Sequence, residues 1–300
     1  MTDTTTQTGI KIESLCFGYT KERLFSNLNL SLSGGNIYGL LGKNGAGKTT
    51  LLKLICGLRI PEAGACAVLG REPRSRPAPL LEDIYFLPEE FYTPPISAEL
   101  YSQIYAPFYP RFSTEMFREY LGEFDLQPKK RLSELSYGQK KKFLLAFGLS
   151  TRCRLVLLDE PTNGLDIPSK SQFRRLLAGA GDGDRIILIS THQVRDMENL
   201  IDPIIILDEG EIIFQQPMYE VSRCVHVEVQ VEQPSGDGVL YCEKTLGGYV
   251  VVRKNEGGEE TQLDLETLFN TVISNRDRIG QLFGSEKMKS SENASKGGAA

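Results

Sequence analysis

The chain has 300 residues, of which 40% are hydrophobic and 24% are charged, and its formal net charge is −5. This composition is typical of a globular protein, and the length allows one large domain or a large and a small one. The acidic balance disfavours nucleic acid as a partner, because a protein that binds many phosphates of DNA or RNA usually carries a basic excess.

The six cysteines are scattered without a CxxC pair, and the chain has two histidines. This pattern disfavours a zinc site or a disulfide framework and favours a reducing compartment. No stretch approaches the roughly 18 apolar residues that a bilayer-spanning helix needs. The N-terminus, MTDTTTQTG, has neither the basic nor the apolar region of a secretion signal. We therefore expect a cytoplasmic protein.

The first part of the chain predicts short strands followed by a helix. Ile10–Phe17 and Leu24–Leu32 alternate between apolar and polar residues, as half-buried strands do. Asn36–Leu41 is a compact apolar strand that ends in a glycine-rich loop. Thr49–Cys56 then places Leu, Leu, Leu and Ile on one side of a predicted helix.

The middle of the chain changes from strand to helix and back. Arg71–Leu81 is rich in Pro and Arg and predicts a surface connection, and Ile84–Leu87 predicts a strand. From Ser97 to Gly148 the pattern is helical and rich in aromatic residues.

Two unbroken apolar runs, Leu155–Leu158 and Ile186–Ile189, follow on either side of a predicted helix at Ser169–Leu177. Apolar runs that alternate with helices indicate parallel strands covered on both faces.

The last part of the chain predicts a small α+β region. Val225–Val231, Val239–Lys244 and Tyr249–Arg253 predict an antiparallel meander, and Leu263–Ile273 predicts a helix. From about Ser285 the composition offers almost nothing to bury, so we expect disorder there.

The segment Gly42-Lys43-Asn44-Gly45-Ala46-Gly47-Lys48-Thr49 fits the phosphate-loop pattern GxxxxGK[ST]. Its glycines allow successive backbone N–H groups to point at phosphates, Lys48 adds a positive charge, and the Thr49 hydroxyl can bind Mg²⁺. The segment lies between an apolar strand and an amphipathic helix, which is the context that the pattern requires. The sequence therefore predicts a P-loop nucleotide hydrolase.

The apolar run Leu155–Leu158 ends in Asp159 and Glu160. Asp159 can hold the magnesium shell beside the phosphate loop, and Glu160 can reach the attacking water as general base. Two acids at a strand end have no such meaning by themselves, and the phosphate loop is what favours this interpretation.

Leu135-Ser136-Tyr137-Gly138-Gln139 resembles the LSGGQ signature of ABC (ATP-binding cassette) ATPases and precedes the acidic strand, as in that family. The resemblance covers about residues 10–215. It implies that the signature binds the ATP of a second subunit, that Tyr19 stacks on adenine, and that Asp166 lies at the dimer seam. His192 then corresponds to the histidine that contacts the γ-phosphate.

The resemblance implies catalytic roles for Glu160, His192 and Lys48, and a magnesium site formed by Thr49, Asp159 and Glu89. The residues implied in ATP binding are Tyr19, Gly42, Asn44, Gly45, Ala46, Gly47, Lys48, Thr49, Thr50, Ser136, Gly138, Gln139 and Asp166. Taken alone, Tyr19 could be a surface aromatic residue and His192 a structural one. Lys140–Lys142 is expected to be a solvated helix face.

Two positions depart from the family pattern. Tyr137 replaces the first glycine of the signature, while Ser136 and Gly138 are kept, so we expect function to survive. In Phe86-Leu87-Pro88-Glu89-Glu90, Glu89 replaces the usual glutamine, and Glu90 is an alternative at that position. An acid there could bind magnesium or its water but adds negative charge beside the triphosphate.

The resemblance implies an α/β fold of the P-loop ABC type, with an antiparallel β subdomain and a helical subdomain at about residues 90–150. We expect the ATPase domain at residues 1–217, a small accessory domain at 218–285 and a disordered tail at 286–300. A dimer, most simply a homodimer, would bind ATP and Mg²⁺ on the cytoplasmic face of the membrane.

The segments FLPEE and Phe108–Phe112 resemble bacterial exporter cassettes that act through a separate membrane subunit, so export is expected. Residues that could receive a helix of this subunit, or instead form subdomain core, are Phe91, Tyr92, Pro94, Pro95 and Tyr101. The alternatives are a soluble ABC ATPase acting on ribosomes or nucleic acid, and a regulatory nucleotide sensor. The single cassette and the absence of a heptad run disfavour the first, and Glu160 disfavours the second.

Overall fold

The structure is a computed structural model that describes residues 9–181, 183–234, 236, 238–257, 261 and 263–283. The chain divides into two compact units. The first holds the chain up to Pro203 together with Leu207–Ile212, and the second holds Ile204–Ile206 and the chain from Ile213 onward. The domain boundaries at 217/218 and 285/286 stay predictions, and the tail expected to be disordered lies outside the described residues.

The largest sheet among the described residues contains β3 (Asn36–Leu41), β5 (Ile84–Leu87), β6 (Leu155–Asp159), β7 (Ile186–Thr191), β8 (Ile204–Asp208) and β9 (Glu211–Gln216). Its strand order is β5-β6-β7-β3-β8-β9. β5, β6, β7 and β3 are parallel, which confirms the prediction made for β6 and β7, and every residue of these two strands is buried. The predicted strands did not include β8 or β9, although Ile204–Leu207 is another unbroken apolar run.

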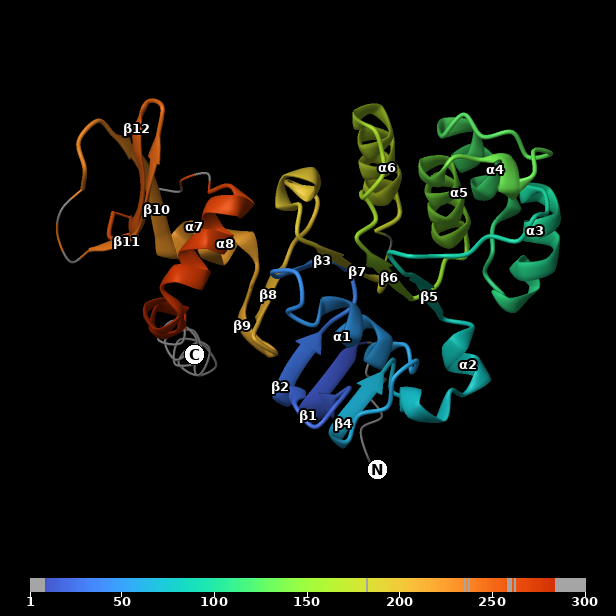
Figure 1. The fold of residues 1–300 in the computed structure, drawn as a ribbon, viewed down its shortest axis with the longest axis horizontal. Helices are drawn as coiled ribbons and strands as arrows, with labels where there is room; N and C mark the ends of the chain where they lie inside the picture. The colour runs from blue at the N-terminus through green and yellow to red at the C-terminus, as the bar shows by residue number, and fades with distance from the viewer. Residues whose placement is uncertain are drawn as a thin grey trace, which may run out of the picture. The chain divides into compact units, whose positions relative to one another are not determined.

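Helices cover both faces of this sheet. In Figure 1, α1 (Lys48–Ile55) lies on the side facing the N-terminal strands, and α6 (Ile167–Gly179) lies on the opposite side. Because helices bury both faces of a parallel sheet, its strands contain apolar residues in unbroken runs. The sequence pattern therefore has a direct structural cause.

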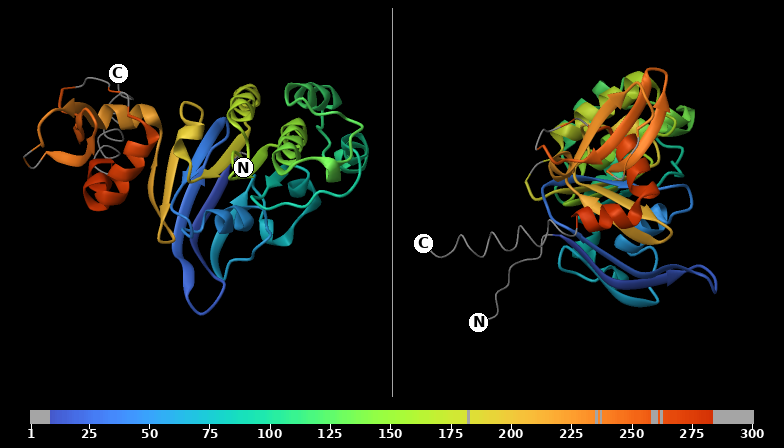
Figure 2. Two further views of the ribbon diagram at one scale, coloured as in Figure 1. Left: turned by 45° about the horizontal axis from the view of Figure 1, so that its top comes forward. Right: turned by 90° about the vertical axis from the view of Figure 1, so that its left-hand side faces the viewer.

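A second, antiparallel sheet has the order β2-β1-β4 and is formed by β1 (Ile10–Gly18), β2 (Arg23–Leu32) and β4 (Ala63–Val68). Its strands are blue in Figures 1 and 2. β2 alternates between buried and exposed residues in its second half, which confirms the predicted half-buried strand. β4 was not predicted, because AGACAV contains mostly small residues and its first three are exposed.

The predicted surface connection contains two short helices, η1 (Pro73–Ser75) and α2 (Ala78–Leu81). The predicted helical segment contains α3 (Ala98–Tyr105), η2 (Ala106–Phe108), α4 (Thr114–Glu123), η3 (Leu132–Glu134) and α5 (Tyr137–Ser150). The Ser97 and Ser113 side chains cap α3 and α4 by accepting backbone N–H groups. Phe147, which is 1% exposed, is packed among Tyr85, Tyr101, Tyr109, Phe112 and Phe117. This aromatic cluster forms the core of the helical segment.

The second unit contains α7 (Met218–Cys224), β10 (Val225–Gln230), β11 (Val239–Thr245), β12 (Gly248–Lys254) and α8 (Leu265–Ser274). The strands are antiparallel, as predicted, but the order β10-β12-β11 is not a meander, because β12 lies between the other two (Figure 2, orange). A central strand needs both edges paired, and β12 carries the buried Val251 and Val252. The most buried of the three strands is therefore the central one.

No helix in the described part of the chain is long and apolar enough to cross a membrane. All six cysteines are free thiols.

Candidate functional site

The phosphate-loop segment connects β3 to α1 in a conformation that requires glycine. Gly45 and Gly47 have φ values of 83° and 108°, in the left-handed region. A Cβ atom on Gly47 would also lie 2.8 Å from the Phe25 ring. Residues 42–47 therefore form a tight turn immediately before the first turn of α1, where backbone N–H groups have no helical partner.

Lys48, the first residue of α1, turns its side chain back over this loop. Its Nζ donates hydrogen bonds to the carbonyl oxygens of Gly42, at 2.7 Å, and Lys43, at 3.2 Å. Burial lowers the pKa of Lys48, while Glu160, Asp159 and Glu89 act in the opposite direction. The ammonium group is thus pre-positioned in the loop and faces three acids.

Asp159, at the end of β6, is fully buried and is held through both carboxylate oxygens. Its Oδ2 accepts from the Thr49 hydroxyl at 2.7 Å, and its Oδ1 accepts from the Ser190 hydroxyl of β7. The strand order places the ends of β6, β7 and β3 side by side, which brings residues 49 and 159 together across 110 positions of sequence.

Glu160 is 4% exposed and has a φ of 47°, a left-handed conformation that is unusual for a residue with a side chain. Its Oε1 accepts from the backbone N of His192 at 3.0 Å and lies 2.7 Å from His192 Nδ1. Lys48 Nζ is 3.8 Å from the same oxygen. Glu160 Oε2 is buried without any hydrogen-bond partner. One carboxylate oxygen is therefore held in place, while the other is available to accept a proton.

A cavity of about 500 Å³ brings most of the predicted site residues together. The predicted residues that line it are Tyr19, Asn44, Gly45, Gly47, Lys48, Thr49, Thr50, Glu89, Glu160 and His192. Of the remaining phosphate-loop residues, Gly42 accepts from Lys48 and Ala46 is buried.

Tyr19 stands at this cavity with 57% of its surface exposed. Its hydroxyl is 3.2 Å from Thr50 Oγ1, and the Arg59 guanidinium lies over its ring, 5.5 Å from the centroid. The ring is therefore tethered at its hydroxyl end and contacts Phe17 and Arg59, while more than half of the residue's surface stays exposed.

Glu89 reaches the cavity from the lid loop, the segment Pro88–Pro95 that follows β5. Its Oε1 accepts from Asn163 Nδ2 at 2.9 Å, and Asn163 Oδ1 accepts from Gln193 Nε2 at 3.1 Å. Glu90 does not line the cavity. Glu89 therefore has the better position of the two, and its role as a metal ligand stays a prediction.

The signature segment lies outside this cavity. Ser136 caps α5 in a capping box, in which its hydroxyl accepts from Gln139 N and Gln139 Oε1 accepts from Ser136 N. A Cβ atom on Gly138 would lie 2.6 Å from the Gly164 carbonyl oxygen. Gly138 is thus required for close packing within the chain, a role that the signature motif does not predict.

Asp166 also lies outside the cavity and caps α6 by accepting from Ser169 N at 2.9 Å. Hydrogen bonds from Ser169 lower the pKa of this carboxyl group. Asp166 is therefore ionised in the loop that follows β6.

Lys141 overturns the prediction that Lys140–Lys142 forms a solvated helix face. Its exposure is 0%, and its Nζ donates to the carbonyl oxygens of Glu160, at 2.8 Å, and Asn163, at 3.1 Å. Burial lowers the pKa of Lys141 to about 8. Three consecutive lysines gave no signal of this difference, because only the packing of α5 against the loop after β6 determines which lysine is enclosed.

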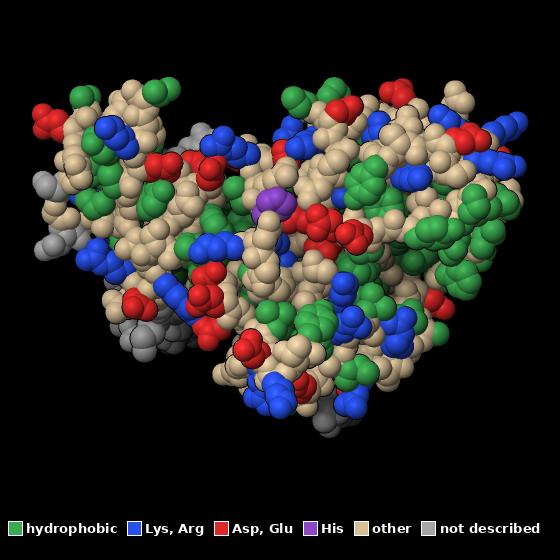
Figure 3. Space-filling model, viewed as in Figure 1, with side chains coloured by type: hydrophobic (Ala, Val, Ile, Leu, Met, Phe, Trp, Pro, Cys, Tyr) green, Lys and Arg blue, Asp and Glu red, His purple; other side chains and the backbone are tan. Residues whose placement is uncertain are grey.

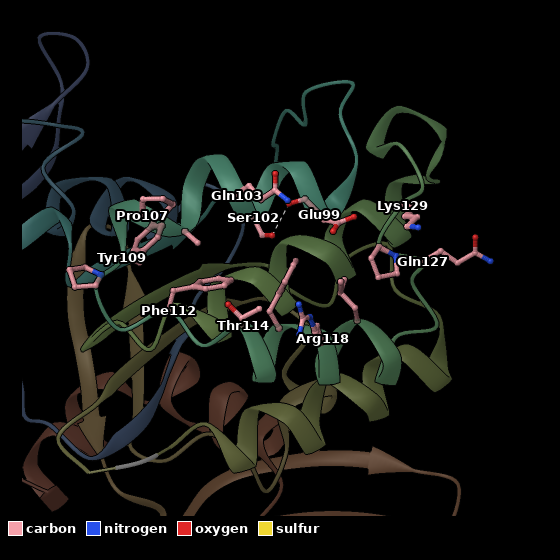
Figure 4. A pocket seen from close by; sticks show the side chains of 15 residues that line it. Glu99, Ser102, Gln103, Pro107, Tyr109, Phe112, Thr114, Arg118, Gln127 and Lys129 are labelled. Atoms are coloured by element: carbon pink, nitrogen blue, oxygen red, sulfur yellow. Dashed lines mark hydrogen bonds between the residues drawn. The ribbon is translucent and has the colours of Figure 1, made fainter.

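A larger cavity of about 870 Å³ lies in the helical segment, between α3 and α4 (Figure 4). Its walls combine Tyr109 and Phe112 with polar side chains such as Glu99 and Arg118. None of the predicted site residues lines it. Volume alone therefore does not identify the chemical site, and the clustered acids, lysine and histidine do.

The oxygen atoms of Thr49 and Asp159 are suited to Mg²⁺, which prefers hard oxygen ligands. Among the described residues, no group of three His, Cys, Asp or Glu side chains could by itself hold a metal ion. Mg²⁺ commonly binds through one or two protein oxygens together with substrate phosphates and water, and this pair fits that mode.

The comparisons with known proteins agree with this geometry. Residues 25–163 match the family model described as ABC transporter. The chain is 32% identical over 219 residues to the lantibiotic transport ATP-binding protein SrtF of Streptococcus pyogenes. The alignment covers 69% of this chain and 90% of SrtF.

A second relative is the bacitracin transport ATP-binding protein BcrA of Bacillus licheniformis, 31% identical over 219 residues and covering 71% of each chain. A solved structure described as the ATP-binding subunit of an ABC transporter aligns with a TM-score of 0.66 at 24% identity. This alignment covers 72% of this chain and 92% of the solved chain, and at that identity it shows the fold.

Proposed function

The chain belongs to the ABC transporter family as an ATP-binding, ATP-hydrolysing subunit, and from this premise we propose that it drives export through a separate membrane subunit. The observation that carries the proposal is that Lys48, Thr49, Glu160 and His192 line one cavity at the phosphate loop, and that the buried Asp159 accepts a hydrogen bond from Thr49.

In this proposal the phosphate loop and Lys48 bind the β- and γ-phosphates of ATP. The backbone N–H groups of residues 43–49 and the positive end of α1 face anionic oxygens, and the Lys48 ammonium adds a full charge. Tyr19, with its exposed ring at the cavity, stacks on the adenine base. The groups that bind the nucleotide are thereby separated from the groups that act on it.

Hydrolysis then depends on Glu160 and His192. Glu160 Oε2 accepts a proton from the attacking water, since this oxygen is buried and has no other partner. The contact of His192 Nδ1 with Oε1 holds both the carboxylate and the imidazole ring, so that the other ring nitrogen can contact the γ-phosphate in the cavity that His192 lines. Thr49 and Asp159, with Glu89 from the lid loop, would hold Mg²⁺. When bound, this ion would neutralise charge on the β- and γ-phosphate oxygens.

The signature residues Ser136, Gly138 and Gln139, and Asp166, lie outside the cavity of their own chain. This position supports the proposal that they act on the ATP of a second copy in a head-to-tail dimer. ATP would then join the two copies, and hydrolysis would separate them.

The membrane subunit is proposed to dock on the lid loop and α3. Tyr92 of the lid loop is 82% exposed, and Leu100 and Ile104 of α3 and Phe108 of η2 are exposed as well. Figure 3 shows hydrophobic side chains gathered over α3. Of the other candidates, Tyr101 packs on Phe143 and Phe147 as subdomain core. The docking role is therefore proposed for the exposed residues.

The decisive experiment uses the tagged Glu160→Gln protein, which keeps the shape of the site and loses the proton acceptor. The variant is purified from native membranes in mild detergent with ATP, and co-purifying chains are identified by mass spectrometry. A Lys48→Ala variant, which lacks the phosphate-binding ammonium, is the matched control. The expected result is an ATP-dependent recovery of one multi-span membrane protein in near-equal amount.

Recovery of soluble, ribosomal or DNA-associated proteins alone would overturn the transport proposal and leave the ATPase assignment intact. Reconstitution of the wild-type chain with the recovered partner in vesicles should then stimulate ATP hydrolysis. Steady-state turnover by the Glu160→Gln protein at the wild-type rate would contradict the role assigned to Glu160.

A further inference from the structure

Lys141 is a fully buried charged residue that the proposed mechanism does not use. It lies one helical turn after Gly138 on α5, and its Nζ has two acceptors, the carbonyl oxygens of Glu160 and Asn163. Both acceptors belong to the loop that follows β6. An ammonium group that is enclosed without a carboxylate at hydrogen-bond distance is costly to bury, so its position calls for a specific purpose.

The hydrogen bond from Lys141 helps to hold the backbone of Glu160 in an unusual conformation. Its left-handed conformation is maintained only where the surrounding structure holds it. On one side, Glu160 N donates to the carbonyl oxygen of Ser190, at 3.0 Å. On the other side, its carbonyl oxygen accepts from Lys141 and from Asn163 N, at 3.2 Å. Since Ser190 holds the peptide group before Glu160, Lys141 is the side chain that holds the peptide group after it.

Two further contacts make the start of α5 a rigid support for this loop. Gly138 approaches the Gly164 carbonyl so closely that no Cβ atom would fit between them. The Lys141 ammonium also lies 5.5 Å from the centroid of the Tyr137 ring, whose hydroxyl donates to the Glu89 carbonyl oxygen. The start of α5 thus contacts two loops: the loop after β6 that carries Glu160, and the lid loop.

We propose that Lys141 is a positioning residue for ATP hydrolysis, which fixes the Glu160 backbone so that Oε2 faces the attacking water. This inference rests on the proposed role of Glu160 as general base. Helix α5, which begins in the signature segment, would then support Glu160 of its own chain. This role is in addition to the proposed contact of the signature with the ATP of the neighbouring copy.

The test compares Lys141→Met and Lys141→Gln with the wild-type protein and with Lys140→Met as matched control. Methionine fills a similar volume without a donor, and glutamine keeps a donor. Nucleotide affinity, measured with a fluorescent ATP analogue, should stay within about twofold, because the phosphate loop is untouched. The kcat of Lys141→Met should fall about 10- to 100-fold, as expected for a displaced catalytic group. Lys141→Gln should recover part of this loss, and Lys140→Met should match the wild type.

A double-mutant cycle separates positioning from a general structural role. If Lys141 acts through Glu160, Lys141→Met should lower the residual turnover of Glu160→Gln by no more than about twofold, since the group that it positions is already absent. Additive losses would overturn the inference, as would a folded Lys141→Met protein with normal kcat. Failure of both Lys141 variants to give a cooperative melt would assign the residue to core stability and also overturn it. Normal turnover by Glu160→Gln alone would instead refute the proposed function.

Discussion

Tyr137 of α5 stands where the ABC signature normally has glycine. In the structure its side chain contacts the lid loop. Its ring stacks on Phe91 with centroids 5.1 Å apart, and its hydroxyl donates to the Glu89 carbonyl oxygen at 2.8 Å. Changing Tyr137 to Gly would restore the family pattern and remove both contacts. The variant should therefore lose stability while keeping its ATPase activity, because Ser136 and Gly138 are unchanged.

The size of the effect follows from these contacts. Loss of an aromatic pair costs about 0.5–1.5 kcal/mol, and loss of a half-exposed hydrogen bond costs about 0.5 kcal/mol. Glycine in the first turn of α5 adds up to about 1 kcal/mol. The sum is about 2 kcal/mol, which corresponds to a fall in Tm of about 4–8 °C for a unit of this size. Tyr137→Phe, which loses only the hydroxyl, should melt about 1–2 °C lower.

Thermal unfolding and steady-state ATP hydrolysis are measured on the wild-type, Tyr137→Phe and Tyr137→Gly proteins. Hydrolysis should stay within about threefold in all of them. A folded Tyr137→Gly protein without ATPase activity would refute the reasoning, because it would place Tyr137 in the chemistry and not in the support of the lid loop. Equal Tm values for all three proteins would refute the energetic argument.

Three further predictions follow from single contacts. Thr49→Ala removes the hydroxyl that donates to Asp159, so the Mg²⁺ concentration for half-maximal ATPase activity should rise at least about 10-fold in a magnesium titration, and Thr49→Ser should retain the wild-type value. Phe147→Ala empties the centre of the aromatic cluster and should lower the free energy of unfolding by about 3–5 kcal/mol. The change is measured by unfolding in urea, and a loss below about 1 kcal/mol would contradict the packing described. Burial raises the pKa of the Cys153 thiol to about 12, so this thiol stays protonated and should not react with iodoacetamide at pH 8. The exposed Cys242 should react under the same conditions. Mass spectrometry of the labelled peptides distinguishes the two, and labelling of both at equal rates would show that Cys153 is accessible.

Most of the fold could be predicted because its signals are local. The apolar runs of β6 and β7 and the alternation in β2 depend on neighbouring residues. β4 was missed because small residues give little periodicity, and the order β10-β12-β11 could not be read because strand pairing is not encoded in any single strand.

The residues that meet at the candidate site could be predicted from the sequence, whereas the contacts between them could not. The spacing of Gly42–Thr49 and the acids after β6 indicated nucleotide chemistry, since those residue types at that spacing serve phosphate and Mg²⁺. The pairing of Thr49 with Asp159 and the pairing of His192 with Glu160 arise only when the ends of parallel strands are brought together. Sequence therefore names the participants, and sheet topology makes them neighbours.

Lys141 shows where this division lies. The sequence by itself determined the phosphate loop, the acidic strand and the family, because each depends on a few residues at fixed spacing. Only the tertiary structure decided that one of three consecutive lysines is enclosed against the loop after β6. The physical reason is that burial depends on what packs against a helix face, and here the packing partner comes from a loop that begins about twenty residues further along the chain.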